Sequence, residues 1–290
     1  MIRRCIAALV LVTAGTAAWA QVPVEAGPDV DTGLKSSTQK PLWELGIGVS
    51  GLRLPDYRGS DQSHRYLLPF PYIVYRGTWL KSDREGTRAL LFNSPAAKLD
   101  LSFGATAPTK SSDNSARDGM PSLPGNAEVG PSLNLTLAQS DKKGWKLDLR
   151  MPLRTAVTLQ RSPRYVGFTF SPNLNLDLIG ADGGWNIGLL TGPLFADRKF
   201  HEQYYGVDAA YATANRPAYD AKGGYAGWQT LASTSRRFGN TWVGGFARYD
   251  SLHGAVYEDS PLVRRNSALT VGFAVSWILT TSSATVESRE

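Results

Sequence analysis

Residues 145–154, WKLDLRMPLR, alternate between apolar and charged side chains. Neighbouring side chains on a β-strand point to opposite faces, so one face of this stretch is wholly apolar and the other is ionic. An arginine or lysine facing the middle of a bilayer costs about 2–4 kcal/mol, and soluble monomers avoid exposing a large apolar face. The stretch therefore predicts a strand with hydrocarbon on its apolar side and a wet interior on the other. Its apolar face is Trp145, Leu147, Leu149, Met151 and Leu153, and its ionic face is Lys146, Asp148, Arg150 and Arg154.

The same alternation recurs along the chain, usually after a turn-like stretch that ends in tryptophan. Tryptophan is enriched where a membrane meets water, and placed at one height on successive strands it forms a girdle. We expect such a girdle from Trp43, Trp79, Trp145, Trp185, Trp242 and Trp277. A soluble barrel or sandwich with its apolar faces inward is the alternative, because alternation alone does not tell inside from outside.

These runs predict an all-β fold, a transmembrane antiparallel β-barrel of about 12 strands. Ten strands remain open, since the third and fourth runs are weak. Short connections alternate with long ones, as expected for short periplasmic turns and long extracellular loops. The expected strands are residues 42–52, 65–76, 78–83, 88–93, 97–107, 126–137, 145–155, 165–178, 185–196, 223–236, 241–250 and 267–279.

The ends of the chain predict export. Arg3 and Arg4 precede an apolar stretch and an Ala18-Trp19-Ala20 cleavage site, the pattern of a secretory signal peptide. We expect four parts: a signal peptide at 1–20, a flexible periplasmic N-terminal segment at 21–40, an outer-membrane β-barrel at 41–280 and a C-terminal tail at 281–290. A plug inside the barrel is the alternative for residues 21–40. The location is then the cell outer membrane of a Gram-negative bacterium.

Composition narrows the chemistry. The chain has 31 Lys+Arg against 25 Asp+Glu, a formal net charge of +6, with both signs interspersed. The absence of a basic stripe argues against nucleic acid as a partner. The one cysteine, Cys5, lies in the signal peptide, so the mature chain offers no thiolate and no internal disulfide. We expect no cofactor.

Ionic residues on the inward parity of the runs are the main candidate site. They suit a selectivity lining for small solutes or a salt-bridged filling that stiffens the barrel, and the sequence favours the filling. Arg248 shares its parity with Trp242 and Phe246, so it either reaches the outer interface or lies beyond a bulge. The expected lumen-lining set is Glu44, Lys98, Asp100, Glu128, Lys146, Asp148, Arg150, Arg154 and Asp177.

A catalytic rim is the other candidate site. The histidines, His64, His201 and His253, all fall in expected outer loops, with Ser60 and Ser63 near the first of them. A lipid hydrolase needs a serine hydroxyl within hydrogen-bond reach of an imidazole that a third group orients. No nucleophile-elbow pattern surrounds any serine, and the histidines lack metal-ligand spacing. We expect no catalytic residues and no metal site.

Five stretches in order resemble one family. They are residues 57–65 (YRGSDQSHR), 69–77 (PFPYIVYRG), 119–124 (GMPSLP), 204–209 (YYGVDA) and 248–263 (RYDSLHGAVYEDSPLV). Together they resemble the MipA/OmpV family of outer-membrane β-barrels, and the likeness runs through residues 41–279.

That resemblance implies a non-enzymatic role in the cell envelope. The member that gives the family its name is a scaffold that links a lytic transglycosylase to a murein synthase, and other members are described as surface antigens or adhesin-like proteins. We therefore expect a scaffold for peptidoglycan machinery, with a murein hydrolase or synthase in the periplasm and outer-membrane lipid and lipopolysaccharide as partners. A small-solute channel and a surface adhesin or antigen are the alternatives, and an outer-membrane lipid hydrolase is less favoured.

Overall fold

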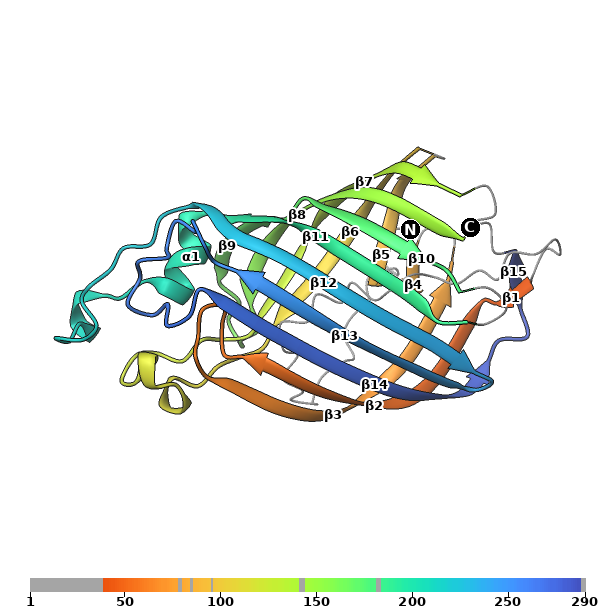
Figure 1. The fold of residues 1–290 in the computed structure, drawn as a ribbon. Coiled ribbons are helices and arrows are strands. Elements are labelled where there is room, and N and C mark those ends of the chain that lie inside the picture. Colours follow the sequence, from red (N-terminus) through yellow and green to blue (C-terminus); the bar gives the residue numbers. More distant parts are fainter. Residues whose placement is uncertain are drawn as a thin grey trace, which may run out of the picture.

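The chain folds into a closed antiparallel β-barrel (Figure 1). The computed structural model describes residues 39–77, 80–83, 86–94, 96–140, 144–180 and 184–287. The expected signal peptide, residues 21–38 and Trp79 lie outside the described residues.

Twelve strands form the wall, which confirms the predicted fold class and the higher of the two strand numbers. Strands β9 and β10 both pair with β8 and β11, so they form one strand interrupted at residues 171–172. Pro172 has no N–H to give to the ladder, which accounts for the interruption. The strands are β2 Trp43–Pro55, β3 Ser63–Arg76, β4 Leu80–Asp83, β5 Gly86–Asn93, β6 Ala97–Thr106, β7 Asn126–Gln139, β8 Trp145–Thr158, β9 Tyr165–Phe170, β10 Asn173–Leu178, β11 Asn186–Ala196, β12 Gly224–Phe238, β13 Thr241–Ser251 and β14 Ser267–Thr281.

The last strand closes the barrel on the first. Strand β14 pairs with β2 from Val271 opposite Arg53 to Thr281 opposite Glu44. Closure matters because hydrocarbon offers no partner to an unpaired backbone N–H or C=O. Strand β4 is the shortest part of the wall and pairs with β3 only at Tyr75 and Arg76.

The outward face of the wall is apolar. Ile47, Phe273 and Leu279 are 57%, 62% and 67% exposed, whereas Thr270 and Ser276 on the inward face of β14 are fully buried. Apolar side chains therefore point away from the barrel axis, as a wall in contact with hydrocarbon requires. This orientation excludes the alternative of a soluble barrel with its apolar faces inward.

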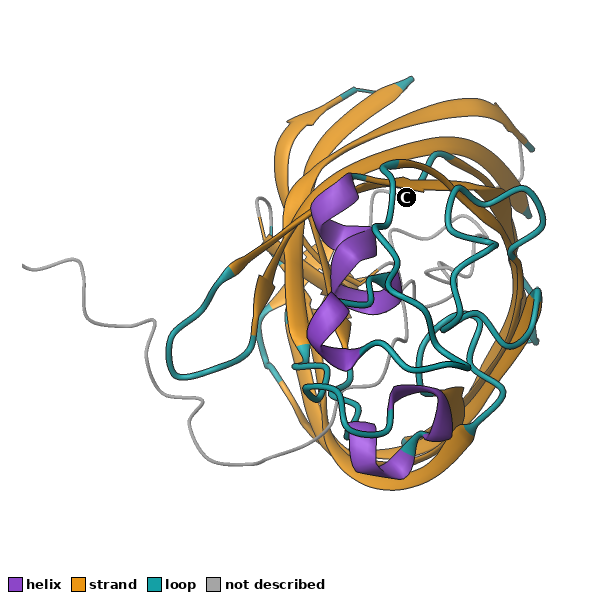
Figure 2. Ribbon diagram, turned by 90° about the vertical axis from the view of Figure 1, so that its left-hand side faces the viewer, coloured by secondary structure: helices purple, strands orange, loops and turns teal. Residues whose placement is uncertain are grey.

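The two ends of the barrel differ. Long connections at residues 56–62, 107–125, 159–164, 197–223 and 252–266 gather at the outer end, where α1 Arg198–Tyr205 and three 3₁₀ turns lie across the opening (Figure 2). The inner end carries short turns and a two-stranded ribbon of β1 Gln39–Pro41 and β15 Thr285–Glu287 (Figure 1). Within the described residues, no helix has the length and apolar character needed to cross a membrane.

The close approach of β7 and β8 gives a first prediction. A Cβ at Gly130 would lie 1.9 Å from the carbonyl oxygen of Leu153, so no side chain fits there without moving the backbone. We predict that Gly130→Ala lowers the free energy of unfolding by about 1–3 kcal/mol through overpacking. Gly144→Ala is the control, because the nearest atom to its Cβ, Ser140 Oγ, is 3.7 Å away. Urea unfolding followed by tryptophan fluorescence measures both, and equal stabilities would contradict this strand contact.

Candidate functional site: the barrel interior and its outer cap

The nine ionisable residues expected inside the barrel all lie on the inward face. The register pairs Lys98 with Asn134, Glu128 with Gly104 and Asp148 with Asn175, each across neighbouring strands. Eight of the nine lie on β6, β7, β8 and β10, and only Glu44 lies elsewhere. We call the inward face of these four strands the ionic wall. Its role as a lining or a filling stays a prediction.

The ionic wall is internally paired. Lys146 lies 2.7 Å from Asp148, and Arg150 lies 3.4 Å from Asp177. Asp100 accepts a hydrogen bond of 2.9 Å from Asn134, while Arg154 Nε donates to Ser102 Oγ at 3.0 Å. Opposite charges placed this close favour each other over a passing solute, so the geometry supports a stiffening filling more than a selectivity lining.

Glu44 joins distant strands at the inner end. Its carboxylate is 1% exposed and accepts hydrogen bonds of 2.8 Å from both Arg76 and Arg237. These arginines come from β3 and β12, so one carboxylate connects three strands around the seam where the barrel closes.

The expected tryptophan girdle is present only in part. Trp145, Trp185 and Trp277 face outward and are 39%, 48% and 45% exposed, and Trp43 is partly exposed. Trp242 is different, because it pairs with the fully buried Ser276 and its ring lies 6.5 Å from Tyr72 inside the barrel. The expectation that Trp242 contacts the lipid interface is wrong.

The inward position of Trp242 also explains Arg248. Strand β13 pairs with β14 without a register shift from Thr241 to Ser251, so no bulge separates the two residues. Arg248 is 5% exposed and pairs with Thr270, which is fully buried. Trp242, Phe246 and Arg248 therefore share the inward face, and the outward positions of β13 carry Val243, Gly245, Ala247 and Tyr249 instead.

A buried ion-pair triad ties the first outer loop to the wall. Asp250 is fully buried, and its carboxylate lies 3.1 Å from Arg58 Nε and 2.9 Å from Arg248 Nε. The side chains of Arg58 and Arg248 are only 14% and 6% exposed. The triad therefore holds residues 56–62 to β13 from inside the barrel.

Above this triad the outer loops build a hydrophobic core of their own, which we call the cap core. Tyr205 and Tyr257 stack with ring centroids 3.6 Å apart, and both contact the ring of His201. Eleven of the twelve members come from four separate connections and Ala226 comes from β12, so the loops pack on one another across the opening (Figure 2). They are Tyr57, Ala116, Leu123, Tyr204, Tyr205, Val207, Ala221, Ala226, Leu252, Ala255, Tyr257 and Leu262.

The sequence pattern did not predict the cap core, because it identified the outer connections only as long extracellular loops. The available signal was the tyrosine content of those connections, at positions 57, 204, 205 and 257. Tyrosine buries a large apolar ring and needs one hydrogen bond for its hydroxyl. Tyr57 and Tyr257 donate theirs to the carbonyls of Leu262 and Ala226 at 2.7 and 2.9 Å.

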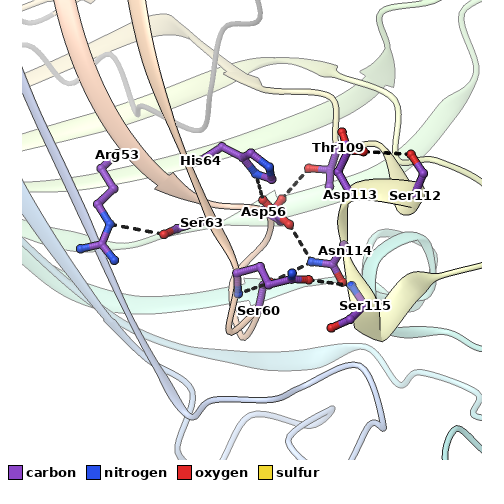
Figure 3. A network of polar contacts seen from close by, with 11 residues as sticks. Arg53, Asp56, Ser60, Ser63, His64, Thr109, Ser112, Asp113, Asn114 and Ser115 are labelled. Carbon is purple, nitrogen blue, oxygen red and sulfur yellow. Dashed lines mark hydrogen bonds and ion pairs between the residues drawn. The ribbon is translucent and has the colours of Figure 1, made fainter.

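A polar network joins the loops at residues 56–62 and 107–125 (Figure 3). The Asp56 carboxylate contacts His64 Nδ1 at 2.5 Å and accepts from Asn114 Nδ2 at 2.7 Å, while its carbonyl accepts from Thr109 Oγ1 at 2.7 Å. Asn114 also donates to Ser60 Oγ at 3.0 Å. The network fastens the first hairpin to the connection between β6 and β7.

This network does not assemble a hydrolase. Ser63 Oγ accepts from Arg53, and Ser60 Oγ is engaged by Asn114, so neither hydroxyl contacts His64 (Figure 3). His253 Nδ1 lies 3.4 Å from Glu258. Across the part of the chain that the structure describes, none of the three histidines makes a hydrogen bond to a serine. The same part contains no group of three His, Cys, Asp or Glu side chains suited to a metal.

His201 is the titratable group most deeply placed in the cap core. It is 1% exposed, its Nδ1 bonds the carbonyl of Lys222 at 2.6 Å, and its Nε2 is buried without a hydrogen-bond partner. Burial lowers the pKa of His201, and the positive charge of Arg58 lowers it further. The carbonyl of Lys222 and the carboxylate of Asp197 oppose this without reversing it. These effects together favour the neutral imidazole in the closed cap.

A ring of twelve strands, an apolar outward face, ionic side chains in the interior and a loop cap at one end define an outer-membrane β-barrel protein. The family model described as MltA-interacting protein MipA matches residues 47–279. The chain belongs to the MipA family.

Two solved structures are similar to the chain in fold only. A bacterial polysaccharide outer membrane secretin has a TM-score of 0.40 and 10% identity, over 83% of this chain and 99% of that chain. Outer membrane phospholipase A from Escherichia coli has a TM-score of 0.32 and 12% identity, over 83% of this chain and 91% of that chain. Likeness at this level says nothing about activity. A comparison with curated proteins gave no match.

The buried triad gives a second prediction. Asp250→Asn leaves two buried guanidinium groups without a carboxylate, so we predict a loss of about 3 kcal/mol or more in stability. The control is Asp220→Asn, whose ion pair with Arg198 is exposed on both sides and contributes little. Urea unfolding and limited proteolysis of residues 56–62 report the two effects. Equal behaviour of the two variants would contradict the assigned role of the triad.

The buried imidazole gives a third prediction. Because the pKa of His201 is lower in the folded chain than its usual 6.5, its contribution to cap stability is complete above that value and is lost as the pH falls. We predict that the protection factors of the α1 amides, which correct for the intrinsic pH dependence of exchange, fall severalfold from about pH 8 to about pH 5, a range that spans the ordinary histidine pKa. His201→Asn keeps a donor for Lys222 but does not titrate, so its exchange should vary less with pH. A profile identical to that of the wild type would refute the assignment to His201.

Proposed function

We propose that the chain is a non-enzymatic outer-membrane scaffold that holds murein hydrolases or synthases beneath the membrane. One observation carries this proposal, the match of the family described as MltA-interacting protein MipA over residues 47–279. MltA is a murein hydrolase, so the description of the family indicates the class of enzyme that we expect this chain to bind. Export by the N-terminal signal peptide and residence among outer-membrane lipid and lipopolysaccharide belong to the same proposal.

The geometry of the two ends is consistent with a scaffold. Peptidoglycan lies in the periplasm, so a murein enzyme has access only to the inner end of the barrel. The inner end carries the turn at residues 239–240, the ribbon of β1 and β15, and the short connections from β5 to β6, from β7 to β8 and from β10 to β11. The closure formed by Glu44, Arg76 and Arg237 gives this end a rigid frame. A rigid surface loses little conformational freedom when a partner binds.

The alternatives have less support. A solute channel needs an open path, whereas the cap core lies across the outer opening (Figure 2). An adhesin would bind through the outer loops, and their aromatic side chains are largely used within the cap core. A rim lipid hydrolase lacks a serine in contact with any histidine among the described residues.

A tagged pull-down tests the scaffold, and it is the fourth prediction. Purification from crosslinked envelopes should recover a murein hydrolase or synthase above the level seen with an unrelated outer-membrane barrel. Inserting a short epitope after Gly239, where a Cβ meets nothing within 4 Å, should reduce recovery severalfold by crowding the inner end.

The matched control carries the same insertion after Arg161, in the exposed outer loop at residues 159–164. Only variants that keep the heat-dependent mobility shift of a folded barrel are compared. Wild-type protein that recovers no murein enzyme would sink the proposal. Equal loss from both insertions would show that binding does not depend on the inner end.

A further inference from the structure

The interior of the barrel has a second, apolar side. The inward positions of β3 and β13 carry Tyr66, Leu68, Phe70, Tyr72, Trp242 and Phe246, a set that we call the apolar wall. Their orientation follows from register, since Phe70 pairs with Gly48, Trp242 with Ser276 and Phe246 with Gly272. Apolar residues are expected on the lipid side of a membrane barrel, while the interior is normally polar. The apolar wall is therefore an exception that requires an explanation.

The apolar wall and the ionic wall face each other. Around the ring the strand order is β13, β14, β2, β3, β4, β5, β6, β7, β8, then β9 with β10, β11 and β12. Strands β13, β14, β2 and β3 therefore lie opposite β6, β7, β8 and the interrupted strand. Between the Glu44 cluster at the inner end and the Asp250 triad at the outer end, one half of the cross-section presents aromatic rings and leucine, and the other presents paired charges. The cross-section is amphipathic.

The aromatic rings lie along the wall and do not extend across the interior. A Cβ at Gly48 would be 2.4 Å from the Phe70 ring, and a Cβ at Gly244 would be 2.4 Å from the Trp242 ring. The glycines therefore make room for the rings to lie on the backbone. All six side chains of the apolar wall remain partly exposed, in contrast to the buried acids of the ionic wall. Each additional Å² of apolar surface removed from water contributes about 25 cal/mol, so an apolar occupant would be stabilised there.

The barrel wall is incomplete beside the apolar wall. Strand β4 pairs with β3 only at Tyr75 and Arg76, and β5 pairs with β6 only as far as Leu101. Among the described residues, no strand pairs with positions 63–71 of β3 on the side away from β2, or with positions 102–106 of β6 on the side away from β7. Pro69 and Pro71 lie on this stretch of β3, and proline in a sheet is confined to edges and bulges.

This gap opens toward the bilayer. Leu67 and Ile73 on the outward face of β3 are 73% and 52% exposed, so the strand crosses the hydrocarbon layer. Beyond the outer end of the gap, the network of Asp56 and Asn114 joins the two flanking loops (Figure 3). The cap core covers the route from outside water. Among the described residues, this unpaired stretch between β3 and β6 is therefore the part of the wall where the apolar wall lies nearest to membrane lipid without a strand between them.

We propose that the apolar wall binds an acyl chain of a phospholipid, which enters from the membrane between β3 and β6 and directs its polar head toward the ionic wall. The gap determines the source, because hydrocarbon lies directly outside it. The two walls determine the chemical class, because an amphiphile with a chain and a zwitterionic head matches rings on one side and paired charges on the other. The chain's own residues 21–38, QVPVEAGPDVDTGLKSST, contain no aromatic residue and three acids, which is a poor match to an aromatic surface.

Quenching of Trp242 by brominated lipid tests the proposal. The mature protein is prepared with Trp242 as its sole tryptophan and reconstituted in nanodiscs of phosphatidylcholine with or without bromine on its acyl chains. The reference is a matching variant with Trp277, which faces lipid, as its sole tryptophan. The fraction of emission that Trp242 loses should be at least half of the fraction that Trp277 loses. Leu68→Glu places a charge on the apolar wall and should reduce the quenching of Trp242 at least twofold, whereas Leu68→Met should not.

The outcomes separate the occupants. No quenching of Trp242, with Trp277 quenched, overturns the proposal. Quenching that Leu68→Glu leaves unchanged reflects bromine outside the wall and overturns it as well. Quenching that appears only after residues 21–38 are removed assigns the wall to the chain's own N-terminal segment, which also overturns it.

A second measurement avoids the multiple tryptophan replacements. The unaltered mature protein is irradiated in nanodiscs of phosphatidylcholine that carries a diazirine on its acyl chain, and crosslinked residues are located by mass spectrometry. Crosslinks on inward Phe70 or Trp242, besides those on outward Leu67 and Ile73, support the proposal. Crosslinks confined to outward residues overturn it.

Discussion

The pairing of backbone hydrogen bonds in hydrocarbon is the constraint on which this structure depends. Water is absent from the middle of a bilayer, so a strand that crosses it must pair on both edges or lie where another group covers it. The ladder between β14 and β2 meets this requirement at the seam. Once the ring is closed, the register of each strand is fixed, because a slip of one residue would turn an ionic face toward lipid. The apolar band and the ionic wall are thus two consequences of one closed register.

The same constraint explains where the molecule departs from a regular barrel. The strand between β8 and β11 breaks at Pro172 yet stays paired on both sides, so the break leaves little backbone exposed. The wall beside β4 is different, since part of β3 lacks a strand partner there and carries Pro69 and Pro71 instead of donors. Loops then reinforce the outer end, with Asp250 buried between Arg58 and Arg248 and tyrosines stacked above it. The wall and the outer opening are therefore closed by different interactions. Backbone hydrogen bonds close the wall, and burial of side chains in the cap core closes the outer opening.

The strands and the ionic wall followed from local alternation, because side-chain period 2 is written directly into residues such as 145–154. The paired charges were recoverable for the same reason, since Lys146 shares the parity of Asp148, and Arg150 and Asp177 each fall on the inward parity of their own strand. Two features were not recoverable by that route. Residues 66–75, YLLPFPYIVY, are apolar on both faces, so parity could not reveal that one apolar face lines the interior. Trp242 was placed by its position after a turn, whereas its direction depends on the register of β13 with β14, which sets it opposite the buried Ser276. The cap core lies in loops, where no period exists to detect.

These distinctions bear on what belongs to the family and what belongs to this chain. The family match ends at residue 279, within β14, and begins at residue 47, within β2, so it covers nearly the whole wall and all of the outer connections. The ribbon of β1 and β15 lies outside it, and it joins the two ends of the described chain at the inner face of the membrane. The ribbon is therefore a feature of this chain outside the part that the family model covers. The apolar wall differs from the ribbon in this respect. It is built from β3 and β13, which both lie inside the matched region, so it belongs to the part of the barrel that the family model covers.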